Sequence, residues 1–238
     1  MEMISNTESL GNIVMSHPQA ARVFGRHGLD FCCGGNQPLA EACAEKHLDI
    51  ATIIAQIQGE QQSEAPMQTL LDKSFRELVS YIVDKHHVYT RSALQDLAPL
   101  MQKVVTAHGA SHPELIELQG LLEQLRSDME LHLQKEERIL FPFVIELDNE
   151  HPSPPPFGSV ANPIRMMNME HQTDGAILQQ MREVTGGFAL PDDACTSYSA
   201  LYVNLSALVE DLMQHIHIEN HLLFPKAIAR EWEVREHH

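Results

Sequence analysis

Hydrophobic residues recur at helical spacing in four long segments of the chain, separated by stretches rich in glycine or proline. In the first segment Phe75, Leu78, Ile82 and Val83 suit a helix that turns one face to a core. Pro99 predicts a kink or a break in this helix, and the later prolines of the second and fourth segments predict bends. The pattern predicts helices over residues 72–107, 113–147, 162–184 and 192–232.

The first 58 residues show shorter helical patterns, such as L-G-N-I-V and A-A-R-V-F, interrupted by glycine and proline. Residues 1–58 therefore predict a small helical N-terminal domain. Residues 59–69, which begin G-E-Q-Q-S-E-A-P, are polar and weakly patterned and predict a linker. The predicted fold is all-α, with an up-down-up-down four-helix bundle over residues 70–238.

One sequence pattern, D-x3-H-x3-E-x3-L-F-P, occurs twice, at residues 128–142 and 211–225. The two copies are 83 positions apart, and His87 and His171 are separated by nearly the same number, 84. A single His-x3-Glu pair is often only a solvated pair on a helix. Two copies with the same Leu-Phe-Pro ending instead indicate a duplicated helical hairpin.

The spacing of four histidines predicts where the chain turns, because antiparallel helices bring two residues to one level only when the turn lies midway between them. The three midpoints fall near Gly109, Pro152 and Asp193, which are all loop-like places. Residues four apart share one helix face, so two glutamates join the same layer. The sequence thus predicts a dinuclear metal site formed by His87, His132, Glu136, His171, His215 and Glu219.

The ligand types narrow the choice of metal. Imidazole with carboxylate suits iron, manganese or zinc, whereas magnesium and calcium prefer oxygen alone. Two glutamates that bridge both ions would leave an open position on each, which is typical of chemistry or exchange. The neighbouring His86 is rotated away from this face and cannot serve the same site. His217 and His221 are also rotated away and are predicted to lie at the surface or around the site.

Three acids are candidates for supporting roles. Asp128 and Asp211 each precede a predicted ligand by four residues, and we expect them to accept hydrogen bonds from its ring nitrogen. Glu170 precedes His171 and is a candidate proton relay. The alternative for all three is an ordinary solvated carboxylate.

Composition excludes several classes of function. The net charge of −17 disfavours nucleic acid and anionic membranes as partners, because both require clusters of lysine and arginine. Hydrophobic residues make up 43% of the chain, yet none of the runs has the length of a membrane helix, and the start resembles no secretory signal. The four cysteines lack the spacing of a disulfide framework, and we expect a cytoplasmic protein.

The adjacent Cys32 and Cys33 lie in the turn D-F-C-C-G-G-N-Q-P, just before a predicted helix start at Pro38. A helix N-terminus favours thiolate over thiol, so this pair is a candidate for redox chemistry, nitrosylation or iron binding. The alternative is a buried turn.

These residues resemble the repair-of-iron-centres family of di-iron proteins. The resemblance rests on the C-C-G-G turn, the Glu170-His171 pair and the two H-x3-E motifs with L-F-P, and it covers nearly the whole chain. It implies an N-terminal domain of the ScdA type and a hemerythrin-like bundle. It also implies two non-haem iron ions, bridged by carboxylates and an oxo or hydroxo group, at the six positions named above. Oxygen-carrying hemerythrins and ferritin-like oxidases differ in their ligand motifs.

Two functions follow from the resemblance. The first is repair of iron-sulfur proteins damaged by nitrosative and oxidative stress, by binding or reducing nitric oxide or by donating iron, with Cys32 and Cys33 as redox groups. The second is sensing or storage of oxygen or nitric oxide. A zinc-filled site is a third possibility, and the paired domains are compatible with a homodimer.

Overall fold

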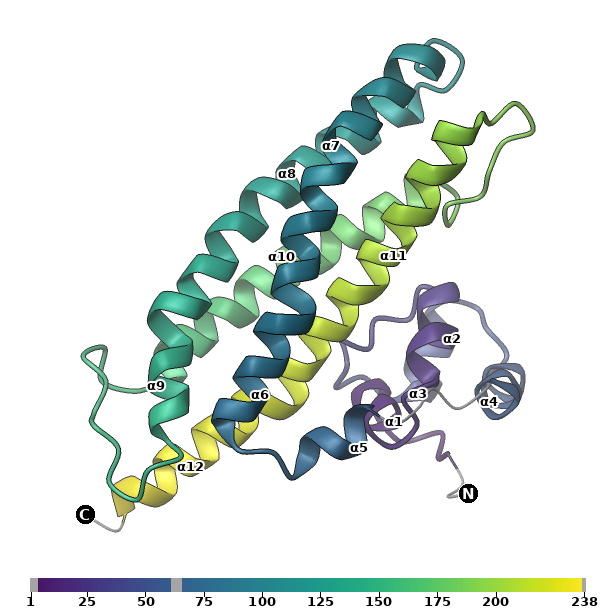
Figure 1. Ribbon diagram of the computed structural model, residues 1–238. Coiled ribbons are helices and arrows are strands. Elements are labelled where there is room, and N and C mark those ends of the chain that lie inside the picture. The colour runs from purple at the N-terminus through teal and green to yellow at the C-terminus, as the bar shows by residue number, and fades with distance from the viewer. Residues whose placement is uncertain (1–3, 61–65, 237–238) are drawn as a thin grey trace.

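A computed structural model describes residues 4–60 and 66–236, and within these ranges the regular structure is helical apart from an isolated bridge between Ser9 and Pro38. Four short helices form the N-terminal part beside a long bundle (Figure 1). They are α1 (Leu10–Ser16), α2 (Ala20–Arg26), α3 (Leu39–Glu45) and α4 (Ile50–Gly59).

The predicted linker is partly helical. Residues 61–65 lie outside the described residues, and α5 (Pro66–Leu71) follows directly. Leu70 is buried in the hydrophobic core of the bundle, which explains why this end of the segment is ordered as a helix.

The four bundle helices confirm the predicted fold, and three of them change from α- to π-helical form along their length. The first consists of α6 (Phe75–Tyr81), η1 (Ile82–His87) and α7 (Val88–His108), and the second of α8 (Glu114–Lys135), η2 (Glu136–Leu140) and α9 (Phe141–Glu146). The third is α10 (Ala161–Val184), and the fourth consists of α11 (Thr196–Ile218), η3 (Glu219–Leu223) and α12 (Phe224–Glu236). The predicted midpoints at Gly109, Pro152 and Asp193 all fall between these helices.

The prolines act differently from one helix to another. The first helix does not break at Pro99, since α7 continues through it, and the buried Leu97 and Met101 on either side hold the helix against the core. Pro142 and Pro225 instead follow the π-helical segments η2 and η3 by two residues. A π-helical turn contains one extra residue, and it often occurs at functional sites.

The bundle core consists of two hydrophobic clusters with a polar layer between them. One cluster includes Leu94, Met129, Ile177 and Leu212, and the other lies toward α9 and α12. Along each helix the predicted histidine falls between residues of the two clusters. The residues of the second cluster that flank the layer are Ile82, Leu140, Met167 and Ile218.

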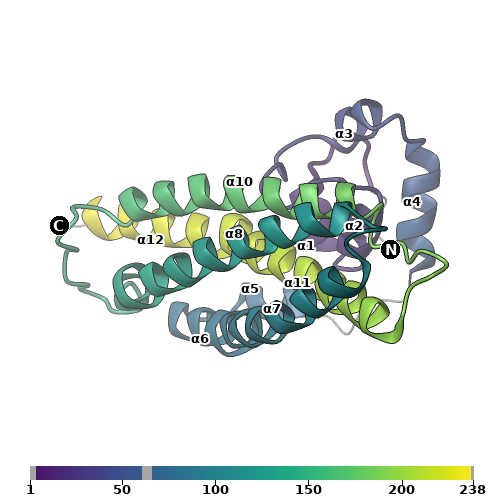
Figure 2. The same cartoon turned by 90° about the horizontal axis from the view of Figure 1, so that it is seen from above.

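The N-terminal helices pack against the fourth bundle helix, as both perpendicular views show (Figures 1 and 2). Their hydrophobic core includes Phe24, Phe31 and Leu39 and extends to Ile216 of α11. Arg182 of α10 donates a hydrogen bond of 2.7 Å to the carbonyl oxygen of Gly25. The N-terminal part is therefore held against the second half of the bundle.

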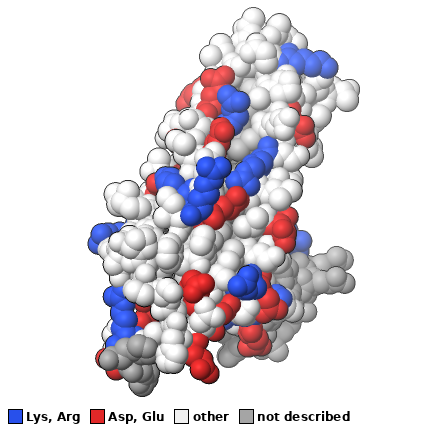
Figure 3. All heavy atoms as spheres, turned by 60° about the vertical axis from the view of Figure 1, so that its left-hand side comes forward, with Lys and Arg blue, Asp and Glu red and all other residues white. Residues whose placement is uncertain are grey.

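Charges of both signs are interspersed on the face of the molecule shown in Figure 3. Among the residues that the structure describes, no helix combines the length and the apolar character needed to cross a membrane.

Candidate metal centre

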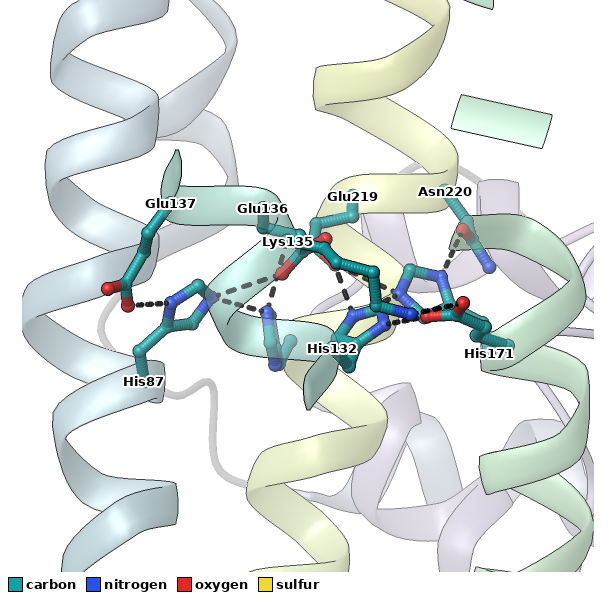
Figure 4. A network of polar contacts seen from close by, with 10 residues as sticks. His87, His132, Lys135, Glu136, Glu137, His171, Glu219 and Asn220 are labelled. Atoms are coloured by element: carbon teal, nitrogen blue, oxygen red, sulfur yellow. Dashed lines mark hydrogen bonds and ion pairs between the residues drawn. The ribbon is translucent and has the colours of Figure 1, made fainter. Parts of the chain in front are cut away.

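The six predicted side chains meet in the polar layer of the bundle (Figure 4). Each of these side chains is at most 1% exposed. Carboxylate and imidazole groups are rarely buried so completely unless they are paired or bind a metal. The two glutamates are the first residues of η2 and η3, and His87 is the last residue of η1. Each π-helical segment therefore begins or ends with a side chain of the layer.

The six side chains form two groups of four that share both glutamates. His87 and His215 form one group with Glu136 and Glu219, and His132 and His171 form the other with the same carboxylates. In the first group the two Nε2 atoms are 3.2 Å apart, and the corresponding distance in the second is also 3.2 Å. The Nε2 atoms lie 3.1–3.4 Å from the nearest carboxylate oxygens.

The arrangement fits a pair of metal ions. All four oxygen atoms of Glu136 and Glu219 are buried and lack a hydrogen-bond donor among the described residues. Buried unpaired carboxylates are costly unless they are paired with cations or coordinate a metal. Burial raises the pKa of each glutamate. The nearby histidines lower it by a larger amount, so the net shift of each pKa is downward.

Three of the four histidines, whose Nε2 atoms face the layer, donate a hydrogen bond from Nδ1 to a neighbouring side chain. His87 Nδ1 donates to Glu137 at 2.8 Å, and His132 Nδ1 donates to Glu170 at 3.0 Å. His171 Nδ1 donates to the amide oxygen of Asn220 at 2.8 Å. In the neutral imidazole these bonds place the proton on Nδ1 and leave Nε2 free to bind a metal, aimed into the layer.

His215 is held differently. Its Nδ1 has no hydrogen-bond partner among the described residues, and its ring stacks on His86, with ring centroids 5.5 Å apart. His86 is buried and its Nδ1 contacts Asp211 at 3.0 Å. We expect from the sequence that Asp211 orients His215, but in the structure Asp211 pairs with His86. The ring of His86 in turn stacks on His215.

Asp128 likewise does not take its expected place. Glu170 occupies the hydrogen-bonding position at His132 Nδ1, and it also pairs with Lys135. The hydrogen bond from His132 and, next, the contact with Lys135 lower the pKa of Glu170 to about 2, so it is a carboxylate. Asp128 lines a cavity of about 190 Å³ beside these residues, together with His132 and Asp174.

Burial raises the pKa of Asp174 to about 6. This carboxyl group lies in the same cavity, which reaches the imidazole of His132 from the surface.

Sequence reasoning missed Glu137 and Asn220 as ring partners. The two residues occupy the same position in the repeat, since each directly follows a shared glutamate and they are 83 residues apart. That equivalence is the signal that could have identified them.

The phenylalanines of the two Leu-Phe-Pro endings also contact the histidines. Phe141 stacks on His87 with ring centroids 5.7 Å apart, and Phe224 stacks on His171 at 5.9 Å. Each therefore restricts the ring of a histidine on a different bundle helix.

The C-C-G-G turn lies directly against this layer. Cys33 Sγ donates to the carbonyl oxygen of His171 at 3.1 Å, and it is 3.7 Å from Cys32 Sγ. Three side chains of the fourth helix hold the backbone of the turn. His217 donates to the carbonyl of Phe31, and Asn220 and His221 donate to the carbonyl of Cys32.

His217 and His221 thus dock the N-terminal domain. His217 is fully buried, not at the surface, and burial lowers its pKa to about 3. Since Asn220 also accepts from His171, it connects the turn to a histidine of the layer.

The expected thiolate activation of Cys32 is wrong. Contact with Cys33, burial and the nearby Asp30 raise the pKa of the Cys32 thiol well above its ordinary value. Helix α3 begins only at Leu39, so its N-terminus does not offset these effects. Cys32 is a thiol that donates toward Asp30 at 3.2 Å.

Two glycines allow this close packing. A Cβ atom at Gly35 would lie 2.4 Å from the Nε2 atom of His221, and one at Gly175 would lie 2.9 Å from Cys33 Sγ. A cavity of about 460 Å³ reaches both thiols and is also lined by Gly175 and Arg182. Small molecules can therefore approach the turn from the surface.

Comparisons with known proteins agree with these features. Residues 6–61 match ScdA_N, a Domain of Unknown function (DUF542), and residues 78–227 match the Hemerythrin HHE cation binding domain. The chain is 34% identical over 223 residues to a probable iron-sulfur cluster repair protein of Haemophilus influenzae, with 93% of this chain and 96% of the relative covered. It is also 34% identical over 229 residues to the iron-sulfur cluster repair proteins YtfE of Yersinia pseudotuberculosis and Yersinia pestis, with 94% of this chain and 98% of each relative covered. The chain therefore belongs to the repair-of-iron-centres family, with a ScdA-type N-terminal domain and a hemerythrin-like domain.

Proposed function

We propose that this chain is a non-haem di-iron protein that restores iron-sulfur clusters damaged by nitrosative and oxidative stress. The observation that carries the proposal is the pair of buried four-residue groups that share Glu136 and Glu219. The relatives in Haemophilus and Yersinia are named iron-sulfur cluster repair proteins, which supports repair as the activity. The substrates would be damaged iron-sulfur proteins.

Six side chains would hold the iron ions: His87 and His215 on one, His132 and His171 on the other, and Glu136 and Glu219 between them. Two imidazoles and the two shared carboxylates for each ion would leave room for a further small ligand. When bound, the iron pair supplies redox-active centres that can take up a small ligand such as nitric oxide or oxygen.

The protein's own groups position the site and its surroundings. Glu137, Glu170 and Asn220 fix the orientation of three imidazoles, whereas Nδ1 of His215 has no such partner among the described residues. We infer that an ion bound beside His215 would be held less tightly and would be the one donated. Cys33 lies against the backbone of His171, so the turn places a redox-capable thiol beside the site.

The test is reactivation of an iron-sulfur enzyme that nitric oxide has inactivated. We expect the iron-loaded protein to restore more activity than an equal amount of free ferrous iron, and the Glu219→Ala variant to restore no more than free iron. Equal recovery with protein and with free iron would count against repair.

Sensing or storage of oxygen or nitric oxide is the second candidate, favoured by the direct contact between the N-terminal turn and the layer. In that case the small ligand would bind reversibly without reactivation of the damaged enzyme. A Mössbauer spectrum of the purified protein separates both from a zinc site, because only coupled iron gives the corresponding signal.

We further propose that the protein acts in the cytoplasm. A homodimer is compatible with its two-domain arrangement, and sedimentation of the iron-loaded protein would test this.

A further inference from the structure

A second cluster of metal-ligating side chains lies at the opposite end of α7 from the polar layer. His108 is the last residue of α7, and His112 lies in the turn that leads to α8. Asp193 and Cys195 belong to the connection before α11. His108 follows His87 by 21 residues of helix, which corresponds to about 30 Å.

The ligand atoms of this cluster are close together. One such atom from each of His108, His112 and Asp193 lies within 4.8 Å of the others. His112 Nε2 is 3.0 Å from Asp193 Oδ1, and His108 Nε2 is 3.2 Å from Cys195 Sγ. Four ligands around a tetrahedral zinc ion, at bond lengths of about 2.0–2.3 Å, are separated by roughly 3.3–3.8 Å. The atoms of His108, His112 and Asp193 can reach this spacing by shifts of their side chains. Cys195 Sγ contacts His108 but lies outside this group of three, so its side chain must turn toward His112 and Asp193 to complete the site.

The surroundings restrict both imidazoles. Each packs against the buried ring of Tyr198, with ring centroids 5.3 Å away for His108 and 5.5 Å for His112. His112 Nδ1 contacts Glu114 at 3.0 Å, so that a carboxylate orients the ring while Nε2 faces Asp193. A carboxylate behind a histidine is the usual arrangement at zinc sites.

We propose that His108, His112, Asp193 and Cys195 bind one divalent transition-metal ion of the zinc class, separate from the di-iron centre. Two imidazoles, a carboxylate and a thiolate form a donor set that suits zinc or cobalt and excludes magnesium and calcium. Binding releases the thiol proton of Cys195 and any proton that His108 or His112 carries on Nε2. The ion connects the α7–α8 turn to the α10–α11 connection. Asp193 is 62% exposed, so the ion can enter from solvent and exchange.

Cobalt(II) titration of the iron-loaded protein tests this site, because a bound thiolate gives a sulfur-to-cobalt charge-transfer band that the histidine and glutamate layer cannot give. We expect the band to saturate at one cobalt per chain in the wild type. It should be absent in Cys195→Ser, while the iron content stays at the wild-type level. Glu114→Gln, which removes only the orienting carboxylate, should weaken cobalt binding by about 10–100-fold.

Asp30, Cys32 and Cys33 of the C-C-G-G turn form another group that could hold a metal ion through thiolates. The double variant Cys32→Ser/Cys33→Ser is therefore the matched control, and it should keep the band. His112→Gln is a second variant at the proposed site, and it should lose tight binding even if Cys195→Ser folds poorly. The proposal is overturned if Cys195→Ser keeps the wild-type band, if the double variant loses it, or if millimolar cobalt gives no band at all.

Discussion

The two halves of the bundle, residues 75–146 and 161–236, contribute equivalent residues to the polar layer but differ on the surface around it. At four equivalent positions, 83 or 84 residues apart, the first half has Arg91, Gln134, Glu137 and Arg138, and the second half has Gly175, His217, Asn220 and His221.

The difference concerns the N-terminal domain. Arg91 and Arg138 are exposed to solvent in the first half. Their counterparts Gly175 and His221 contact the C-C-G-G turn. The two halves supply equivalent inner ligands, whereas these contacts to the N-terminal turn come from the second half.

The largest expected effect tests whether the halves share their carboxylates. Because Glu219 belongs to both four-residue groups, Glu219→Ala should remove both metal ions, whereas Glu210→Ala at an exposed position of α11 should keep them. Elemental analysis of the purified variants measures this. Retention of one full ion in Glu219→Ala would show that the glutamate serves a single ion.

The next effect concerns the ring partners. Glu137→Gln weakens the hydrogen bond that orients His87 and should lower affinity for the adjacent ion by about 10–100-fold. Competition with a chelator measures the change, with Glu130→Gln on the exposed face of α8 as control. An unchanged release curve would mean that the acid serves only its ion pair with Arg91.

The docking surface predicts a smaller, local effect. Gly175→Ala places a Cβ atom against Cys33 Sγ and should destabilise the protein by about 1–3 kcal/mol. Arg91→Ala, at the equivalent position, should cost only about 0–1 kcal/mol, since it breaks an exposed ion pair. Urea unfolding measures both. Adding Cys33→Ala to Gly175→Ala should restore stability, and failure of that rescue would place the strain elsewhere.

The smallest effect compares His221 with Arg138. His221→Ala removes one hydrogen bond to the turn and should cost about 1 kcal/mol, whereas Arg138→Ala at the surface should stay within about 0.5 kcal/mol. Hydrogen exchange of the amides near Cys32 reports the loss directly. Equal exchange in the two variants would contradict a specific role for the second half in docking.

Helix periodicity and the repeat predicted the layer because ligation depends on spacing along each helix. His87, His132 and Glu219 could be placed by counting residues to the turns and along the helix faces. The same counting failed for Asp128 and Asp211. It considers residues on one helix, whereas the observed hydrogen-bond partners lie on neighbouring helices. Glu170 reaches His132 from another helix, and His86 lies between Asp211 and His215.

The contacts of the N-terminal turn were also beyond sequence reasoning. Cys32 precedes a helix, which suggested an activated thiol, but its burial depends on how two distant parts of the chain pack together. His217 appeared to lie off the ligand face and was assigned to the surface or the surroundings of the site. It is instead buried against Phe31, with ring centroids 5.5 Å apart.

The polar layer separates the bundle into two parts, each with its own hydrophobic cluster. In such a bundle the polar layer can open locally while both hydrophobic clusters stay folded, because local opening requires much less free energy than global unfolding. An ion could then depart without loss of the fold. In the proposed repair role, this would let the same folded chain release an ion and take up another.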